Sequence, residues 1–300
     1  MTNIKHIPPA ISCPDCGTVL LLEAYFPGPF FEGQETNCPS CGKNFDLWDY
    51  AVRLLREKAQ LFRNKGAAFI GGHEIYFTFQ LPPNQTAEVD LSQYGVPEDS
   101  KLVYVVYTPM PGAGWPIEMH GNQPLQHRTT HKMVFWGKPL PNSGKHGNNQ
   151  HDVNMSVTYI PKSPDQIPFE HLANAYEHFL ADNYEEMILP SAVALEYAVE
   201  RMTVEILRDL QLPDSLNPSK RLSLEVIVPL VCRLYSVQLL DGRIVELIVK
   251  LWSLRNQMAH EGILKSPLDL GGAARLLVAA MFCLNYLVFF RSVVNTKVKK

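Results

Sequence analysis

The spacing of apolar residues distinguishes a middle part of the chain, with short apolar runs, from a long last part with helical periodicity. Between residues 66 and 160 the runs are rich in β-branched and aromatic residues and are separated by stretches rich in Gly, Pro and Asn. This pattern is typical of antiparallel strands. The runs that predict strands are HEIYFTF, KLVYVVYT, HKMVFWG and DVNMSVTYI. Their spacing favours a β-sandwich or a barrel, and we take an antiparallel β-sandwich as the prediction.

From residue 161 onward, apolar residues recur every three or four positions, which predicts helices. Pro190 is expected to kink or break the first turns of the second helix. Asp241 should cap the fourth helix, and Gly262 should end it. Helices joined by short connections form bundles, so we expect a helical bundle over this part. The ranges expected to be helical are 168–183, 184–210, 223–240, 241–262 and 267–294.

Four cysteines near the N-terminus form the most specific motif of the sequence. They occur as CPDCG and CPSCG, with 21 residues between the two pairs. Two thiolates from one tight turn can reach one ion, and two such turns complete the tetrahedral sulfur site that suits zinc. The alternatives are disulfides or a chance arrangement. Because sulfur would take all four positions, the zinc would be structural rather than catalytic. The predicted ligands of this zinc ribbon are Cys13, Cys16, Cys38 and Cys41.

A basic helix is predicted directly after the ribbon, over DLWDYAVRLLREKAQLFRNKG. One interpretation is a solvated linker helix, since a run of charges is usually a face that water covers. The other is a patch that contacts the phosphates of a nucleic acid. The cations of this candidate patch are Arg53, Arg56, Lys58, Arg63 and Lys65.

The composition indicates a folded chain whose net charge gives no general attraction to nucleic acid. Of the 300 residues, 46% are hydrophobic and 19% are charged, as in globular proteins, and the net charge is −3. Any contact with phosphate must therefore come from a local cluster of cations. Together the patterns predict an α+β multidomain protein with a zinc ribbon and basic helix in 1–65, a β-sandwich domain in 66–160 and a helical bundle in 161–300.

The sequence predicts neither export nor a membrane span. The N-terminal segment has no apolar run long enough for a signal peptide. The most apolar segment, residues 276–290, is shorter than the roughly 20 residues that cross a bilayer, and Asn285 interrupts it. We therefore expect a buried helix there, no association with a membrane, and a protein of the reducing cytoplasm.

The predicted helix over 241–262 carries three polar residues that suit phosphodiester chemistry. Asn256 and His260 are four positions apart, so they share one face, about 40° from each other around the axis. Arg255 lies on the neighbouring face. The alternative is a structural helix end, in which Arg255 pairs with Glu261 or another carboxylate and His260 caps carbonyl groups. The apolar residues expected to face the core are Leu247, Leu251, Leu254 and Met258.

This arrangement resembles the HEPN family (higher eukaryotes and prokaryotes nucleotide-binding), whose members carry Arg, a polar residue and then His at this spacing. In that family the motif lies late in a long helix of a small bundle. The order of helices is similar too: a short helix, a tight turn, and a long helix with an Ala-rich stretch that bears Glu196. The resemblance covers about residues 168–295. Pro190 and Pro229, within predicted helices, depart from the family pattern.

The resemblance implies metal-independent cleavage of RNA, in which the ribose 2′-hydroxyl attacks the adjacent phosphorus and a 2′,3′-cyclic phosphate results. His260 would serve as general acid or base, because imidazole exchanges a proton near neutral pH. Arg255 would hold the phosphate whose negative charge builds up in the transition state. Asn256 would orient His260 or the phosphate. Family members pair two chains around one cleft, so a homodimer through the bundle is implied.

The sequence leaves two classes of function open. The first is an endoribonuclease whose N-terminal parts respond to a protein or nucleic-acid trigger, similar to bacterial toxins and phage-defence effectors. The alternative is a non-catalytic module that binds nucleic acid or protein and whose bundle only dimerises. The pair Arg255 and His260 favours the first, and the net charge of −3 favours the second.

Overall fold

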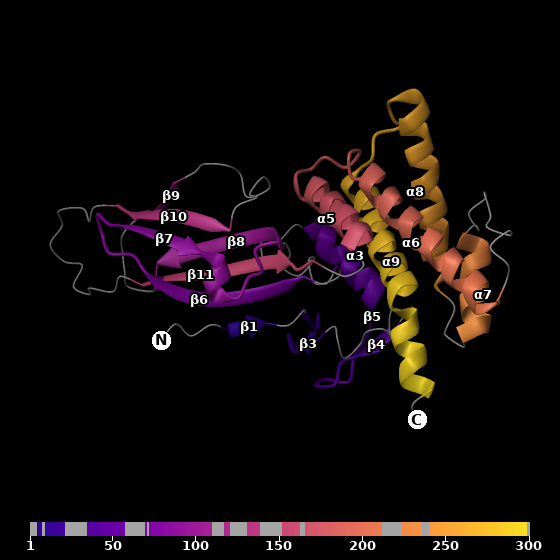
Figure 1. Ribbon diagram of the computed structural model, residues 1–300, viewed down its shortest axis with the longest axis horizontal. Helices are drawn as coiled ribbons and strands as arrows, with labels where there is room; N and C mark the ends of the chain where they lie inside the picture. The colour runs from indigo at the N-terminus through magenta and orange to yellow at the C-terminus, as the bar shows by residue number, and fades with distance from the viewer. Residues whose placement is uncertain are drawn as a thin grey trace. The chain divides into compact units, whose positions relative to one another are not determined.

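The computed structural model contains both helices and sheets, which confirms the α+β part of the prediction (Figure 1). Contacts divide the chain into two compact units. We call them the sheet unit, Met1–Pro9 with Arg63–Lys162, and the helical unit, Ala10–Phe62 with Ser163–Lys300. The structure describes residues 5–7, 10–21, 35–57, 70, 72–109, 117–120, 131–138, 152–162, 166–211, 224–235 and 240–298.

Within its described residues, the sheet unit contains two antiparallel sheets. The order of strands is β1-β6-β11-β8 in the first and β7-β10-β9 in the second. The four predicted strands are confirmed as β6, β8, β10 and β11. The strands are β1 (Lys5–Ile7), β6 (His73–Gln80), β7 (Thr86–Asp90), β8 (Lys101–Pro109), β9 (Ile117–His120), β10 (Lys132–Gly137) and β11 (Asp152–Ile160), with a short 3₁₀ helix over Leu91–Tyr94.

Alternating residues of both sheets form one apolar core. On β11, Val153, Met155 and Val157 point to the same side and are fully buried, as the period of two in a strand requires. Phe79 of β6 and Phe135 of β10 belong to the same cluster, and their ring centroids are 5.0 Å apart. One core therefore joins the faces of the two sheets.

The helical unit begins with two short hairpins that carry the four paired cysteines. Strands β2 and β3 pair in the first hairpin, and β4 and β5 pair in the second. A helix lies within each of the five predicted ranges, give or take a few residues at the ends. The strands are β2 (Ala10–Ser12), β3 (Val19–Leu21), β4 (Glu35–Asn37) and β5 (Asn44–Asp46), and the helices are α3 (Leu47–Glu57), α5 (Gln166–Leu180), α6 (Ile188–Asp209), α7 (Leu224–Tyr235), α8 (Gly242–Glu261) and α9 (Leu270–Val298).

Helix α9 is the centre of the helical unit, in contact with α3, α5, α6 and α8 (Figure 1). Its segment Leu270–Val288 is long and apolar enough to cross a membrane by length and composition, yet 78% of that segment is buried inside the protein. Such burial is typical of a core helix. The polar residue within it, Asn285, donates from Nδ2 to the Met281 carbonyl oxygen at 2.7 Å, which gives its amide a partner inside the core.

The two units differ from the three predicted domains at two places. Strand β1, from the N-terminal segment, pairs with β6 and belongs to the sheet unit. Helix α3, which follows the ribbon, packs against α9, and the rings of Trp48 and Phe282 meet edge to face with centroids 5.7 Å apart. The two cysteine hairpins and the helices therefore belong to one compact unit rather than two.

The second predicted helix begins later than expected. Residues 181–187 form turns, and α6 begins at Ile188 rather than at residue 184. Pro190 therefore lies in the first turn of α6, where a backbone N–H has no partner within the helix and its absence costs little. Pro229 lies inside α7.

Candidate functional site

Each cysteine pair lies in a tight turn that a glycine closes. Gly17 and Gly42 have φ of 73° and 71°, a left-handed conformation that favours glycine. The Gly17 amide donates to the Cys13 carbonyl oxygen at 3.0 Å, and the Gly42 amide donates to the Cys38 carbonyl oxygen at 2.8 Å. The two turns thus have the same local geometry, as the repeated CPxCG motif predicts.

The four sulfur atoms lie close enough to bind one metal ion. All four are within 4.8 Å of one another. The Sγ atoms of Cys13 and Cys41 are 3.8 Å apart, and those of Cys16 and Cys38 are 3.6 Å apart. Four thiolates around one ion at ~2.3 Å would be about 3.8 Å from each other in a tetrahedron. These separations fit shared coordination, and all four cysteines are free of disulfides.

The interactions among the four thiols also favour a bound cation. Hydrogen bonds with the side chain and backbone of Thr18 lower the pKa of the Cys16 thiol to about 6. For Cys41, the Lys43 backbone amide favours the thiolate, but burial and the three neighbouring sulfurs outweigh it and raise the pKa to about 12. One thiolate therefore opposes the ionisation of the next, and a bound cation would relieve this repulsion.

Two of the five cations of the candidate basic patch lie on α3. Arg53 and Arg56 are both exposed. The Arg53 guanidinium lies 5.3 Å from the centroid of the Tyr50 ring and 3.8 Å from the Glu57 carboxylate. A carboxylate thus offsets part of the charge of Arg53. The other three cations lie outside the described residues: Lys58, Arg63 and Lys65.

Helix α8 begins and ends where the sequence predicts. The Asp241 side chain accepts a hydrogen bond from the Arg243 amide at 2.8 Å, and Gly262 ends the helix with φ of 75°. The core stripe is different from the expected one. Its buried residues are Ile244, Ile248 and Leu251, whereas Leu247, Leu254 and Met258 are only partly buried. No residue of α8 after Leu251 is fully buried, so the last turns of this helix lie at the surface.

Arg255 lies against α6. Its guanidinium is 3.1 Å from the Glu196 carboxylate, and it also donates to the Asn256 side-chain oxygen at 3.0 Å. The side chains of Arg255 and Glu196 are 32% and 20% exposed, so water still reaches the pair. The structural alternative expected Arg255 to pair with Glu261 or another carboxylate. The partner is another carboxylate, Glu196, whereas Glu261 pairs with Lys265.

His260 is exposed in the last turn of α8. Within the part of the chain that the structure describes, its ring makes no hydrogen bond or ion pair with another described residue. Five positions separate Arg255 from His260, which corresponds to about 140° around the helix axis. Asn256 is only about 40° from His260. One chain therefore directs Arg255 toward α6 and His260 toward solvent.

A second apolar stripe of α8 was not predicted from the sequence. Val245, Val249 and Trp252 lie on the face that continues to Asn256 and His260, with successive spacings of four, three, four and four. Val249 is 41% exposed, and its two apolar neighbours are partly buried. The spacing is visible in the sequence, but it has the same period as the core stripe, so periodicity does not identify which stripe faces solvent.

Comparison with family models, curated proteins and solved structures found no match for this chain, so its function is inferred from the residues and their geometry.

Proposed function

We propose that the protein is a metal-independent endoribonuclease of the HEPN type, built from a zinc ribbon, a β-sandwich and a HEPN-like bundle. The observation that carries the proposal is the arrangement at the end of α8. Glu196 holds the Arg255 guanidinium beside Asn256, and His260 is exposed one turn further on. A fixed cation, an amide and an exposed imidazole are the groups that cleavage through the 2′-hydroxyl requires.

Each residue has a separate role in this proposal. His260 removes the proton of the ribose 2′-hydroxyl or protonates the leaving 5′-oxygen. Arg255 binds the phosphate through its planar fork and stabilises the negative charge of the transition state. Asn256 orients either group. Glu196 is a positioning residue, because it contacts Arg255 and not the substrate.

A homodimer would complete the site. Since Arg255 and His260 lie about 140° apart around α8, a second chain would bring the missing groups to one phosphate. The stripe of Val245, Val249 and Trp252 is the surface proposed for pairing, since α8 of a second copy can pack on apolar residues at this spacing.

The four-cysteine site is proposed to hold one structural Zn²⁺. Thiolates at these separations suit zinc, and four of them leave no open position for a substrate. The ribbon, the basic helix and the β-sandwich would then recognise a protein or nucleic-acid trigger. We propose a cytoplasmic effector of the toxin or phage-defence kind, whose substrate is RNA.

A second candidate is a non-catalytic binding protein that only dimerises through its helices. The observation in its favour is charge neutralisation: Glu196 pairs with Arg255, and Glu57 lies beside Arg53. Paired cations attract phosphate less than unpaired ones.

Cleavage of RNA by the purified protein in EDTA tests the two candidates. Wild type should cut, and His260→Ala should lower the rate by roughly 10²–10⁴-fold, the usual effect of losing a general acid or base. His178→Ala is the matched control, because His178 likewise lies in the last turn of a helix, α5. Products should end in a 2′,3′-cyclic phosphate. Intact RNA favours the binding protein, and a requirement for magnesium or a 3′-hydroxyl product contradicts the proposed chemistry.

A further inference from the structure

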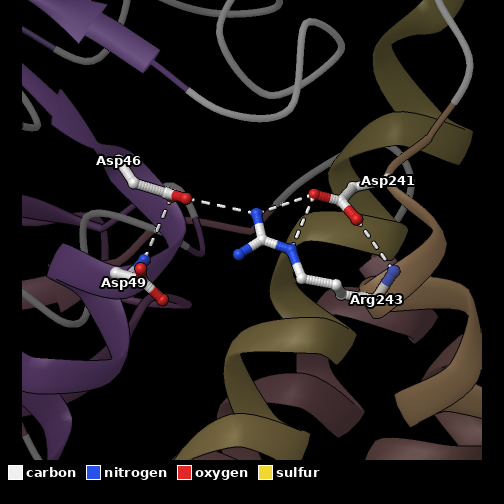
Figure 2. A network of polar contacts seen from close by, with 4 residues as sticks. All are labelled: Asp46, Asp49, Asp241 and Arg243. Atoms are coloured by element: carbon white, nitrogen blue, oxygen red, sulfur yellow. Dashed lines mark hydrogen bonds and ion pairs between the residues drawn. The ribbon is translucent and has the colours of Figure 1, made fainter.

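Arg243 connects the starts of two helices. At the start of α8, the Asp241 carboxylate accepts from the Arg243 amide at 2.8 Å, from its Nε at 2.9 Å and from its terminal nitrogen at 2.7 Å (Figure 2). The same terminal nitrogen lies 3.1 Å from Oδ2 of Asp46. Asp46 in turn accepts from the Asp49 amide at 3.2 Å, at the start of α3.

Asp46 belongs to the hairpin that carries two of the metal ligands. It is the last residue of β5, and β5 pairs with β4 so that Asp46 lies opposite Glu35. Cys38 and Cys41 lie in the turn between these two strands. The position of Asp46 therefore depends on the hairpin, and in so small a module the metal supplies much of the folding free energy.

We propose that Arg243 couples the four-cysteine metal site to the start of α8. With metal bound, the hairpin holds Asp46 in place, and Asp46 holds Arg243 and the first turns of α8. Loss of the metal releases Asp46 and loosens these turns. The expectation that metal loss would then change RNA cleavage rests on the proposed function, because α8 carries Arg255 and His260.

Hydrogen exchange of the full-length protein, with metal bound and after its removal by a chelator, tests the coupling without RNA. In wild type, metal removal should speed exchange in the first two turns of α8 by about two- to fivefold, the size expected for loss of a partly exposed ion pair. Asp46→Asn should have the same effect with the metal still bound. Asparagine caps helices as well as aspartate, so α3 should keep its cap.

Asp49→Asn is the matched control, since it removes a neighbouring carboxylate that is not bonded to Arg243 (Figure 2). It should behave as wild type. If metal removal unfolds the whole helical unit, hydrogen exchange of the metal-bound Asp46→Asn protein is the measurement that tests the coupling. Unchanged α8 exchange in that protein, or a further acceleration there on metal removal as large as in wild type, overturns the proposal.

Discussion

Glu196 on α6 and Arg255 on α8 are 59 positions apart in the sequence, and their carboxylate and guanidinium lie 3.1 Å apart. The contact has two opposite consequences for a phosphate. It orients the guanidinium, which favours binding in one geometry, and it neutralises part of the charge, which weakens binding. A substitution of Glu196 that keeps its shape and removes its charge separates these effects.

Glu196→Gln should lower the rate of cleavage about tenfold, because Arg255 would lose its orientation while keeping its charge. Unfolding free energy should change by less than about 1 kcal/mol, since the pair is partly exposed. Glu205→Gln is the control, because Glu205 lies on α6 like Glu196 and pairs with a different arginine, Arg201. Single-turnover kinetics and urea unfolding are the measurements. Faster cleavage by the Glu196→Gln variant would mean that Glu196 restrains Arg255 rather than positioning it.

Val249→Asp should weaken the proposed dimer by about tenfold or more, since it introduces a charge into the apolar stripe of α8. Val226→Asp is the control, because Val226 is similarly exposed but lies on α7. Sedimentation over a range of protein concentrations measures both. Equal effects of the two changes would argue against pairing through α8.

Cys38→Ser should abolish binding of the proposed zinc and also destabilise the helices. Because α3 packs against α9, the ribbon is not independent of the helical unit. A loss of ~1 kcal/mol lowers the melting temperature of a unit of this size by about 2–4 °C, and we expect at least this shift. Cys232→Ser, on α7 and outside the cluster, should keep its metal. Elemental analysis measures the metal content, and calorimetry measures the melting temperature. A metal-free wild type, or an unchanged melting temperature in Cys38→Ser, would contradict the prediction.

Changing Arg53 and Arg56 to Ala should reduce the salt dependence of RNA binding if both contact phosphate. Each lost contact with a single strand lowers the slope of log affinity against log salt by about 0.7. Arg201→Ala is matched to Arg53→Ala, because each arginine pairs with a glutamate four positions later. An unchanged slope would mean that Arg53 and Arg56 do not contact phosphate and would favour the interpretation of α3 as a solvated helix.

Local patterns predicted local structure well. The repeated CPxCG motif predicts two tight turns, and glycine is favoured at Gly17 and Gly42 because φ is positive there. Asp241 and Gly262 mark the ends of α8 because capping depends on neighbouring residues alone. The strand pattern likewise depends on alternation within a few residues.

Contacts between distant residues could not be predicted in this way. Nothing near Arg255 in the sequence indicates Glu196, and nothing near Arg243 indicates Asp46. Apolar residues lie on more than one face of helix α8, and only packing against α6 and α9 decides that Ile248 is buried and Val249 is exposed. The pairing of β1 with β6 involves three residues, too few for a recognisable period.

Strand β1 has a consequence for any attempt to dissect this chain. Its three residues, Lys5–Ile7, cover one side of β6, and the whole ribbon and α3 are inserted in the sequence between the two strands. A fragment that starts at residue 66 would leave the amide and carbonyl groups of β6 uncovered on that side, which invites aggregation through strand pairing. Because each unit consists of two separate stretches, no single cut divides them. Isolated fragments would therefore report on damaged units, and point substitutions in the full-length chain are the sounder approach.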